Sequence, residues 1–349
     1  MTTGGEMVIF DDEEDFKREK LNAGKWAKVI FDIKDFDSRL IDRALIGCAV
    51  EQYQWTTYQN LASKSNISET KEAFIRNGFE EEKHLIKIGS LIQPLIRSKS
   101  LSETDTIDSL MKQNTVWLET AIITEVAEFA QVEAHQIAKD VLDHLLLDHM
   151  THASIIASAF ADEIDVSKIV DGRYHLQEGR PLQDQMAGVK SVVRQYYNRL
   201  KVGIETKVRI HTIISLETYI LSQYQNFLKL ITDERLRELY ATICAVEADH
   251  VSMLNSLIDP SEPALELAIT GELAEIYNHK RSMRLADKKI ETPFKDAFGE
   301  DLEHLQILAD IADDLGIVEL INRIPVDIPA PEPSLTIDGY ITELIASHG

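Results

Sequence analysis

The feature that most constrains the fold of this 349-residue chain is a spacing of acidic and histidine residues that occurs twice. In each copy a lone glutamate stands thirty residues before a Glu-x-x-His motif, and a Tyr-Gln-Asn tripeptide begins seven residues after that glutamate. The two copies consist of Glu51, Glu81 and His84, and of Glu217, Glu247 and His250. A match over so many positions indicates internal repetition, and therefore a repeated structural unit.

A single Glu-x-x-His spacing is weak evidence, because chance alone produces about two such spacings in a chain with 11 histidines and 59 acidic residues. The related spacing from Asp301 to His304 is interpreted as one of these accidents. Two copies with the same thirty-residue interval are much harder to obtain by chance, so these copies are the candidates for function.

Each copy lies in a predicted helical hairpin, with a turn near Asn66 in the first and near Thr232 in the second. Each turn falls about midway between the lone glutamate and its Glu-x-x-His motif, and residues equidistant from an antiparallel turn lie at the same height. Positions i and i+3 share one face of a helix. Each hairpin is therefore expected to present two carboxylates and one imidazole on a single face.

The chain as a whole predicts an all-α fold, because strand signals are nearly absent and only 15 glycines and 9 prolines interrupt the helical pattern. The expected organisation is an acidic amino-terminal segment (1–36), a helical domain (37–323) and a proline-rich tail (324–349). Within the domain we expect a hairpin at 37–97, inserted helices at 103–202 that bend near 133–140, a second hairpin at 205–257 and carboxyl-terminal helices at 264–321. The proline-rich segment is expected to strap the tail over the body or onto a partner.

The formal net charge of −23 argues against nucleic acids and anionic membranes as partners, because such a field repels phosphate groups. No apolar run approaches the ~20 residues that a bilayer span needs, and the acidic amino terminus does not have the pattern of a signal peptide. The two cysteines, Cys48 and Cys244, form no disulfide framework. A reducing cytoplasm is the expected location.

Placed face to face, the two hairpins would bring four carboxylates and two imidazoles together. This is the ligand set of carboxylate-bridged dinuclear metal centres in helical bundles. Hard oxygen donors suit two iron or manganese ions, and one neutral imidazole for each ion leaves a position open for dioxygen.

With these motifs the chain resembles the ferritin-like superfamily, most closely its branch of ribonucleotide reductase small subunits and bacterial monooxygenases. The resemblance covers 37–96 and 205–257 by motif, and the remainder only by helical character. It implies a four-helix bundle core with inserted and carboxyl-terminal extra helices, holding two iron ions, or manganese in one or both positions. It implies six metal ligands, of which the four glutamates are also the expected catalytic residues: Glu51, Glu81, His84, Glu217, Glu247 and His250.

The chain also departs from that branch. The interval between the two motif copies is longer than usual there, so at least one further hairpin must be inserted. One turn after the ligand histidines stand Ile88 and Leu254, whereas reductase small subunits carry a radical tyrosine after the first such histidine, so a reductase role is not expected. Tyr58 and Tyr224, seven residues after their glutamates, remain on the stripe that faces the metals.

The inserted stretch resembles a degenerate third hairpin, because Glu119 stands thirty residues before His149 and His152 follows. An alternative site would pair the first hairpin with this one. Otherwise its polar residues would surround the metal ligands or be core residues with hydrogen-bond partners. The candidates for these alternative or surrounding roles are Glu119, Glu128, Asp148, His149 and His152.

The expected function is an oxygenase or oxidase that uses a di-iron centre and dioxygen to oxidise a small organic substrate. Electrons would come from a separate donor protein, because the chain has neither a glycine-rich nucleotide loop nor the cysteines of an iron–sulfur cluster. One alternative is oxidation of peroxide or ferrous ions in the manner of rubrerythrin, manganese catalase or ferritin. Another is a non-catalytic helical subunit of a larger oxygenase. The resemblance also suggests a homodimer.

Overall fold

The computed structural model describes residues 36–99, 107–162, 164–185, 195–288, 290–325 and 327–348. The expected acidic amino-terminal segment lies outside the described residues apart from Phe36. The described residues form helices, turns and irregular segments without a strand, so the all-α prediction is confirmed. Among the described helices, none combines the length and the apolar character that crossing a lipid bilayer requires.

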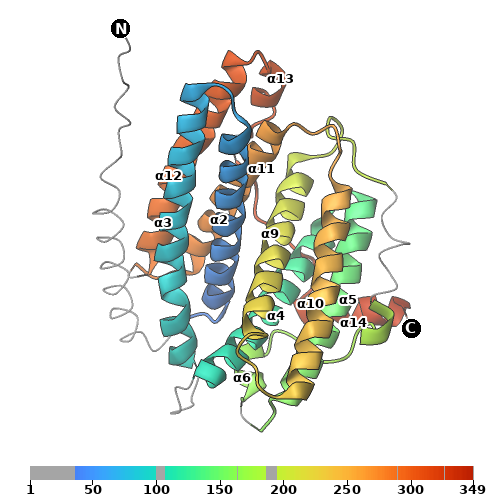
Figure 1. Cartoon of the computed structure of the whole chain (residues 1–349). Helices are drawn as coiled ribbons and strands as arrows, with labels where there is room; N and C mark the ends of the chain where they lie inside the picture. Colours follow the sequence, from blue (N-terminus) through green and yellow to red (C-terminus); the bar gives the residue numbers. More distant parts are fainter. Residues whose placement is uncertain are drawn as a thin grey trace.

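Four long helices from the two ends of the chain pack together and form what we call the first bundle (Figure 1). They are α2 (Arg39–Lys64), α3 (Ser68–Lys99), α11 (Ala264–Leu285) and α12 (Glu291–Asp314). Helices α2 and α3 form one antiparallel hairpin, and α11 and α12 form the other. Contacts of α2 with α11 and of α3 with α12 join the two hairpins.

Four helices from the middle of the chain form the second bundle, beside the first (Figure 1). They are α4 (Ile107–Val132), α5 (Gln136–Ala159), α9 (Ile204–Phe227) and α10 (Glu234–Leu257). Here too two hairpins, α4 with α5 and α9 with α10, pack on each other through contacts of α4 with α9 and of α5 with α10. The inserted helices are therefore half of a second bundle.

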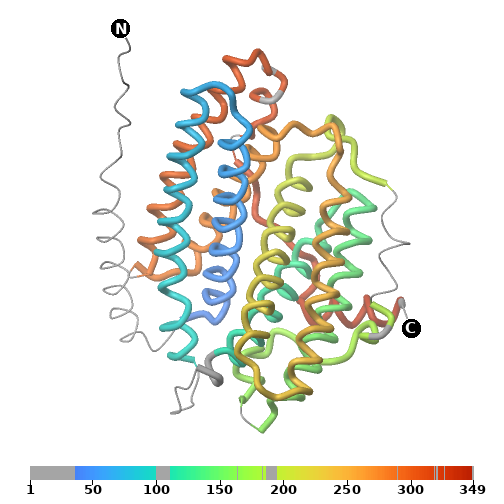
Figure 2. The backbone as a smooth tube through the Cα atoms, viewed as in Figure 1, coloured from blue at the N-terminus to red at the C-terminus, as the bar shows by residue number. Residues whose placement is uncertain are grey.

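The path of the backbone corrects the expected arrangement of hairpins (Figure 2). The hairpin predicted at 37–97 does not pair with the one predicted at 205–257 to make a single four-helix core. The first packs against the carboxyl-terminal helices, and the second packs against the inserted helices. Helices that were expected to be additions are thus integral to both bundles, and the second bundle is nested in the sequence of the first.

Helices α2 and α11 of the first bundle contact α9 of the second, and α2 also contacts α4. At this junction the ring of Tyr53 meets the ring of His211 edge to face, with 5.0 Å between their centroids. Arg43 and Arg281 both pair with the buried carboxylate of Glu125 on α4. The two bundles therefore share a packed and partly ionic interface.

Local sequence explains where the hairpins turn. Helix α4 ends at Val132 and α5 begins at Gln136, within the range where a bend was expected. The His135 ring accepts a hydrogen bond from the amide of Ala138, which caps α5. The Asp233 carboxylate accepts one from the amide of Leu236 and caps α10. These caps satisfy amides that a helix start leaves without a partner.

The short helices α6 (Val166–Val170) and α7 (Leu182–Gln185) lie in the connection after α5, and α13 (Val318–Ile321) follows α12. The chain beyond α13 is irregular over 327–333 and ends in α14 (Ile337–His348), which packs on α4 and α5. The Tyr340 hydroxyl donates to Asp143 at 2.5 Å, and the Leu335 amide donates to Gln131 at 2.9 Å. The tail thus lies on the second bundle through α14, and Asp327 pairs with Lys280 of α11 in the first bundle.

Candidate metal centres

Each bundle encloses a cluster of acidic and histidine side chains. The first cluster lies in the first bundle and consists of Glu51, Glu81, His84, Glu272, Glu275, His279, Asp301 and His304, all at most 1 % exposed. The second cluster lies in the second bundle and consists of Glu119, His149, His152, Glu217, Glu247 and His250, all at most 2 % exposed. Buried charged groups at this density need partners of opposite charge.

In the first cluster, His84 of α3 directs its Nδ1 atom at three carboxylates. This atom lies 3.2 Å from Glu51, 3.4 Å from Glu81 and 3.4 Å from Asp301. Two donor atoms that bind one ion at right angles, each about 2.1 Å from it, lie about 3.0 Å apart. The spacing therefore suits four ligands around one cation.

His304 of α12 repeats this arrangement on the other side of Glu81. Its Nδ1 atom lies 2.9 Å from Glu81 Oε1 and 3.6 Å from Glu272 Oε2. Glu81 therefore belongs to both groups of candidate ligands, and ligand atoms of Asp301 also lie within 4.8 Å of those of Glu272 and Glu275. Two cation positions that share carboxylates are the geometry of a carboxylate-bridged pair.

Carboxylates at the outer nitrogens of His84 and His304 fix the tautomer of each ring. The Nε2 atom of His84 lies 2.8 Å from Glu300, and that of His304 lies 2.6 Å from Glu80. A carboxylate there retains the proton on Nε2, so a neutral ring presents the Nδ1 lone pair to the inner carboxylates. Lone pairs that face each other at about 3 Å repel unless a cation lies between them or the ring takes a second proton.

Three carboxylates of the first cluster have no hydrogen bond. Both oxygens of Glu81, Glu275 and Asp301 are buried without a hydrogen-bond partner. Burial raises the pKa of Glu275 and Asp301 well above the ordinary value, and neighbouring carboxylates raise it further. For Glu51, burial also acts upward, but His84 and His279 together lower its pKa to about 2. The cluster has an excess of negative charge, which cations would balance.

Residues of α2 hold Glu272 of α11, and a residue of α11 holds Glu51 of α2. The Tyr58 hydroxyl donates to Glu272, and because burial and Glu272 raise the pKa of Tyr58, this hydroxyl remains protonated. Gln54 donates to Glu272 at 3.0 Å. It crosses α11 at Gly271, where a Cβ atom would lie 2.1 Å from the Gln54 amide oxygen. His279 Nε2 lies 2.7 Å from Glu51.

The second cluster has the same plan around Glu247. His250 Nδ1 lies 3.1 Å from Glu247 and 3.5 Å from Glu217, and His152 Nδ1 lies 3.0 Å from Glu247. Both Nε2 atoms have outer partners, Asp148 at 3.1 Å for His250 and the Gln185 amide oxygen at 2.8 Å for His152. The histidines again present Nδ1 inward.

The clusters differ at three positions. Glu275 and His279 of α11 correspond to the apolar Ile122 and Val126 of α4, and His149 of α5 stands where Asp301 stands in the first cluster, three residues before the inward histidine. His149 Nδ1 lies 3.0 Å from Glu119 Oε2, and its Nε2 lies 2.9 Å from Glu217 Oε1. The Tyr224 hydroxyl donates to the other oxygen of Glu119. An imidazole therefore occupies the position of a shared carboxylate.

The six residues predicted as one ligand set are all buried and all lie in clusters, but in two different ones. The trio of Glu51, Glu81 and His84 meets residues of α11 and α12, and the trio from α9 and α10 meets residues of α4 and α5. The prediction that the two trios converge on one centre is therefore wrong. The alternative pairing of the first hairpin with the inserted hairpin is also wrong.

The interpretation of Asp301 and His304 as an accidental spacing is corrected as well, because both residues belong to the first cluster. A signal was present: Glu272 precedes Asp301 by twenty-nine residues, close to the interval of the two recognised copies. It was missed because aspartate replaces glutamate and because His279 stands where those copies have tyrosine.

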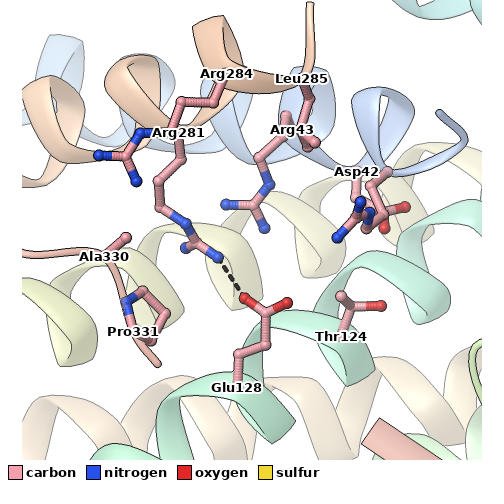
Figure 3. A pocket seen from close by; sticks show the side chains of 10 residues that line it. Asp42, Arg43, Thr124, Glu128, Arg281, Arg284, Leu285, Ala330 and Pro331 are labelled. Carbon is pink, nitrogen blue, oxygen red and sulfur yellow. Dashed lines mark hydrogen bonds and ion pairs between the residues drawn. The ribbon is translucent and has the colours of Figure 1, made fainter. Parts of the chain in front are cut away.

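The remaining candidates separate into two groups. Tyr58 and Tyr224 hold glutamates of the facing hairpins, and Asp148 holds His250, so these three lie at the clusters. Glu128 lies outside both clusters and pairs with Arg281 at the rim of a separate pocket (Figure 3). That pocket is lined by Arg39, Asp42, Arg43, Thr124, Glu128, Arg281, Arg284, Leu285, Ala330 and Pro331. None of these residues belongs to either cluster.

Comparisons with known proteins leave the geometry as the basis for function. No model of a protein family, no curated protein and no solved structure matches the chain. The donor atoms of the two clusters and the residues that hold them are therefore the basis for a functional proposal.

Proposed function

We propose that the first cluster binds two iron or manganese ions and that the protein is an oxidoreductase that activates dioxygen to oxidise an organic substrate. The observation that carries this proposal is that the inward Nδ1 atoms of His84 and His304 lie beside the two oxygens of the same carboxylate, Glu81, at 3.4 Å and 2.9 Å. The same arrangement of acids and imidazoles underlies dinuclear centres in helical bundles of the ferritin-like type.

The donor set fits two ions. Glu51 and His84 would hold one ion, Glu272 and His304 the other, and Glu81 and Asp301 would lie between them. When bound, the ions supply the redox chemistry with dioxygen. The excess of hard carboxylate oxygens supports this choice, because such donors stabilise both divalent and trivalent iron or manganese.

The surrounding residues of the chain orient these donors and exclude water. Glu300 and Glu80 hold the outer nitrogens of the two histidines, which fixes the ring orientation. Tyr58 holds Glu272 from the facing hairpin. Ile88, one turn after His84, is fully buried and packs at Gly47 beside the ring of His279, which gives this side of the cluster an apolar wall. Such a wall strengthens every charge interaction inside the cluster.

The proposal includes a separate electron donor and a cytoplasmic location. The two cysteines are buried on different helices and unpaired, and an iron–sulfur cluster needs four protein ligands. Unpaired cysteines are also usual in a reducing compartment.

The test is anaerobic loading with ferrous iron, metal analysis, and mixing with dioxygen in the presence of a reductant and candidate substrates. We expect Glu81→Gln to lose the ions of the first cluster and the rapid consumption of oxygen. The matched control is Glu303→Gln, which removes an exposed carboxylate from the same turn of α12 that carries His304. We expect this variant to retain both properties.

Two results would overturn the proposal. One is a Glu81→Gln protein that binds as much iron as the wild type and consumes oxygen equally fast. The other is rapid catalytic loss of hydrogen peroxide without oxidation of any organic substrate, which would support the peroxide-scavenging alternative instead.

A further inference from the structure

The second cluster has a different set of donor atoms from the first, because His149 replaces the carboxylate of Asp301. We infer that it binds a single divalent transition-metal ion through Glu217, Glu247, His250 and the Nε2 atom of His149, while Glu119 remains outside the coordination sphere. The chain would then carry two different metal sites, one dinuclear and one mononuclear.

The four proposed ligand atoms are spaced as donors around one ion. His149 Nε2 lies 2.9 Å from Glu217 and 3.9 Å from Glu247. His250 Nδ1 lies 3.1 Å from Glu247 and 3.5 Å from Glu217. Two imidazole nitrogens and two carboxylate oxygens at these separations match the donor types and number that a four-coordinate divalent ion such as zinc accepts.

Hydrogen bonds to the outer nitrogens direct both lone pairs toward this position. Glu119 lies 3.0 Å from His149 Nδ1 and retains the proton there, so the Nε2 lone pair faces Glu217. Asp148 does the same for His250 from the opposite nitrogen. A carboxylate that holds the outer nitrogen of a histidine is the usual support of a metal-bound imidazole.

The second ion of a dinuclear centre has too few donors here. Both oxygens of Glu119 accept hydrogen bonds, one from Tyr224 and one from His149. In the first cluster, by contrast, Glu272 keeps its Oε2 atom without a hydrogen bond. A neutral imidazole also offers one lone pair, whereas the carboxylate of Asp301 offers two oxygens for two ions. Glu119, His149, His152 and Glu247 do lie together on that side. However, the Glu119 oxygens accept hydrogen bonds and the His149 lone pair faces Glu217, which leaves His152 and one oxygen of Glu247 to bind an ion there.

Protonated histidines without metal account for only part of the cluster. A doubly protonated His149 would donate to Glu119 and Glu217. A doubly protonated His250 would donate to Asp148 and Glu247. Glu217 Oε2 would still be buried without a hydrogen-bond partner. A buried carboxylate oxygen without a partner, beside the other three proposed donor atoms, indicates a cation.

The test is loading of the whole protein with manganese(II), followed by metal analysis and electron paramagnetic resonance. We expect about three ions per chain, with the spectrum of an isolated ion superimposed on that of a coupled pair. Glu217→Gln should remove the isolated-ion spectrum and leave about two ions. His149→Asp should raise the content to about four ions and replace the isolated-ion spectrum by that of a second coupled pair.

A second variant keeps the test decisive if the aspartate variant does not fold. Glu119→Gln preserves the shape of the side chain and removes the charge that fixes the His149 tautomer. We expect it to retain about three ions at saturating metal and to bind one of them about 10- to 100-fold more weakly. Loss of an ion at saturating metal would make Glu119 a direct ligand and overturn the inference.

The outcomes for the two clusters are distinguishable. Four ions in the wild type, or no isolated-ion spectrum, would overturn the mononuclear site whatever the first cluster binds. If Glu217→Gln removes the isolated ion but Glu81→Gln changes nothing, the mononuclear site stands and the proposed dinuclear function fails. Circular dichroism on each variant checks that the helices are intact.

Discussion

The two bundles follow one plan, and the comparison of their centres shows how few substitutions alter it. Each hairpin carries a glutamate on its first helix and an inward histidine on its second, and three residues before that histidine stands an acidic residue or, in α5, His149. Tyrosine holds the facing glutamate in both bundles, Tyr58 for Glu272 and Tyr224 for Glu119. The plan diverges where Asp301 in the first bundle corresponds to His149 in the second.

The two clusters also differ in how many of their buried polar atoms have a hydrogen-bond partner. In the first cluster Glu81, Glu275 and Asp301 keep both oxygens without hydrogen bonds, and in the second only single atoms of Glu217, Glu247 and His152 lack partners. The imidazole of His149 thus takes up space and supplies charge where the proposed first site would use cations. A repeated backbone therefore does not ensure a repeated set of donor atoms.

Removal of metal is expected to produce the largest difference between the two bundles. Because the first cluster depends more on cations, chelation should destabilise the first bundle by several kcal/mol more than the second. Hydrogen exchange measured helix by helix before and after chelation checks this. We expect the amides of α3 and α12 to lose more protection than those of α5 and α10. Equal loss in both bundles would contradict the different dependence on cations.

The fold was predictable to the level of helices because the signals are local. The periodicity and the turns near Asn66 and Thr232 gave hairpins that the structure contains at those positions. The pairing of hairpins was not predictable, since all four present acids and imidazoles on similar faces. Which faces meet depends on apolar packing between segments far apart in the chain, as in the contact of α2 with α11.

The candidate sites were predictable in type but not in partnership. Repetition identified Glu51, Glu81 and His84 as one half of a centre, but the other half follows a variant of the pattern with Asp301. Aspartate and glutamate offer the same donor atoms, so chemistry tolerates a change that a motif search treats as a mismatch. Outer partners such as Glu300 carry no spacing signal of their own.

A second, smaller effect concerns the outer partners of the inward histidines. Glu300→Gln removes the carboxylate at His84 Nε2 and should weaken metal binding in the first cluster about 10- to 100-fold. Gln185→Leu removes the partner of His152 and should change metal affinity little, because His152 is not a ligand of the inferred mononuclear site. Competition titrations with a metal indicator measure both. Comparable losses in the two variants would make His152 a ligand.

A third effect is a pH dependence of stability that comes from His211, at the junction of the bundles. Burial lowers the pKa of His211 from 6.5 to about 4. The unfolded chain takes up a proton below pH 6.5 and the folded chain does not, so stability is lost as pH falls from 6.5 toward 4. At pH 5 this costs about 2 kcal/mol relative to pH 7.

The test at the junction compares the wild type with His211→Phe, which keeps a ring against Tyr53. Urea unfolding at pH 7 and pH 5 gives the free energy of unfolding of each protein. The variant should lose about 2 kcal/mol less than the wild type between the two pH values. The cluster carboxylates affect both proteins alike and cancel in this difference. The same pH dependence in both would show that His211 gains no proton on unfolding.

The smallest effect is expected from the tyrosines that the two bundles share. Tyr58→Phe leaves the proposed ligand Glu272 with one fewer donor, and loss of one such hydrogen bond costs about 1 kcal/mol, or about fivefold in metal affinity. Tyr224→Phe removes the matching bond from Glu119, which supports His149 from outside the coordination sphere, so its effect should be smaller. Metal titrations of the two variants test this order. A larger loss for Tyr224→Phe would mean that Glu119 binds metal directly, because only a direct ligand passes the full cost of a lost hydrogen bond to the ion.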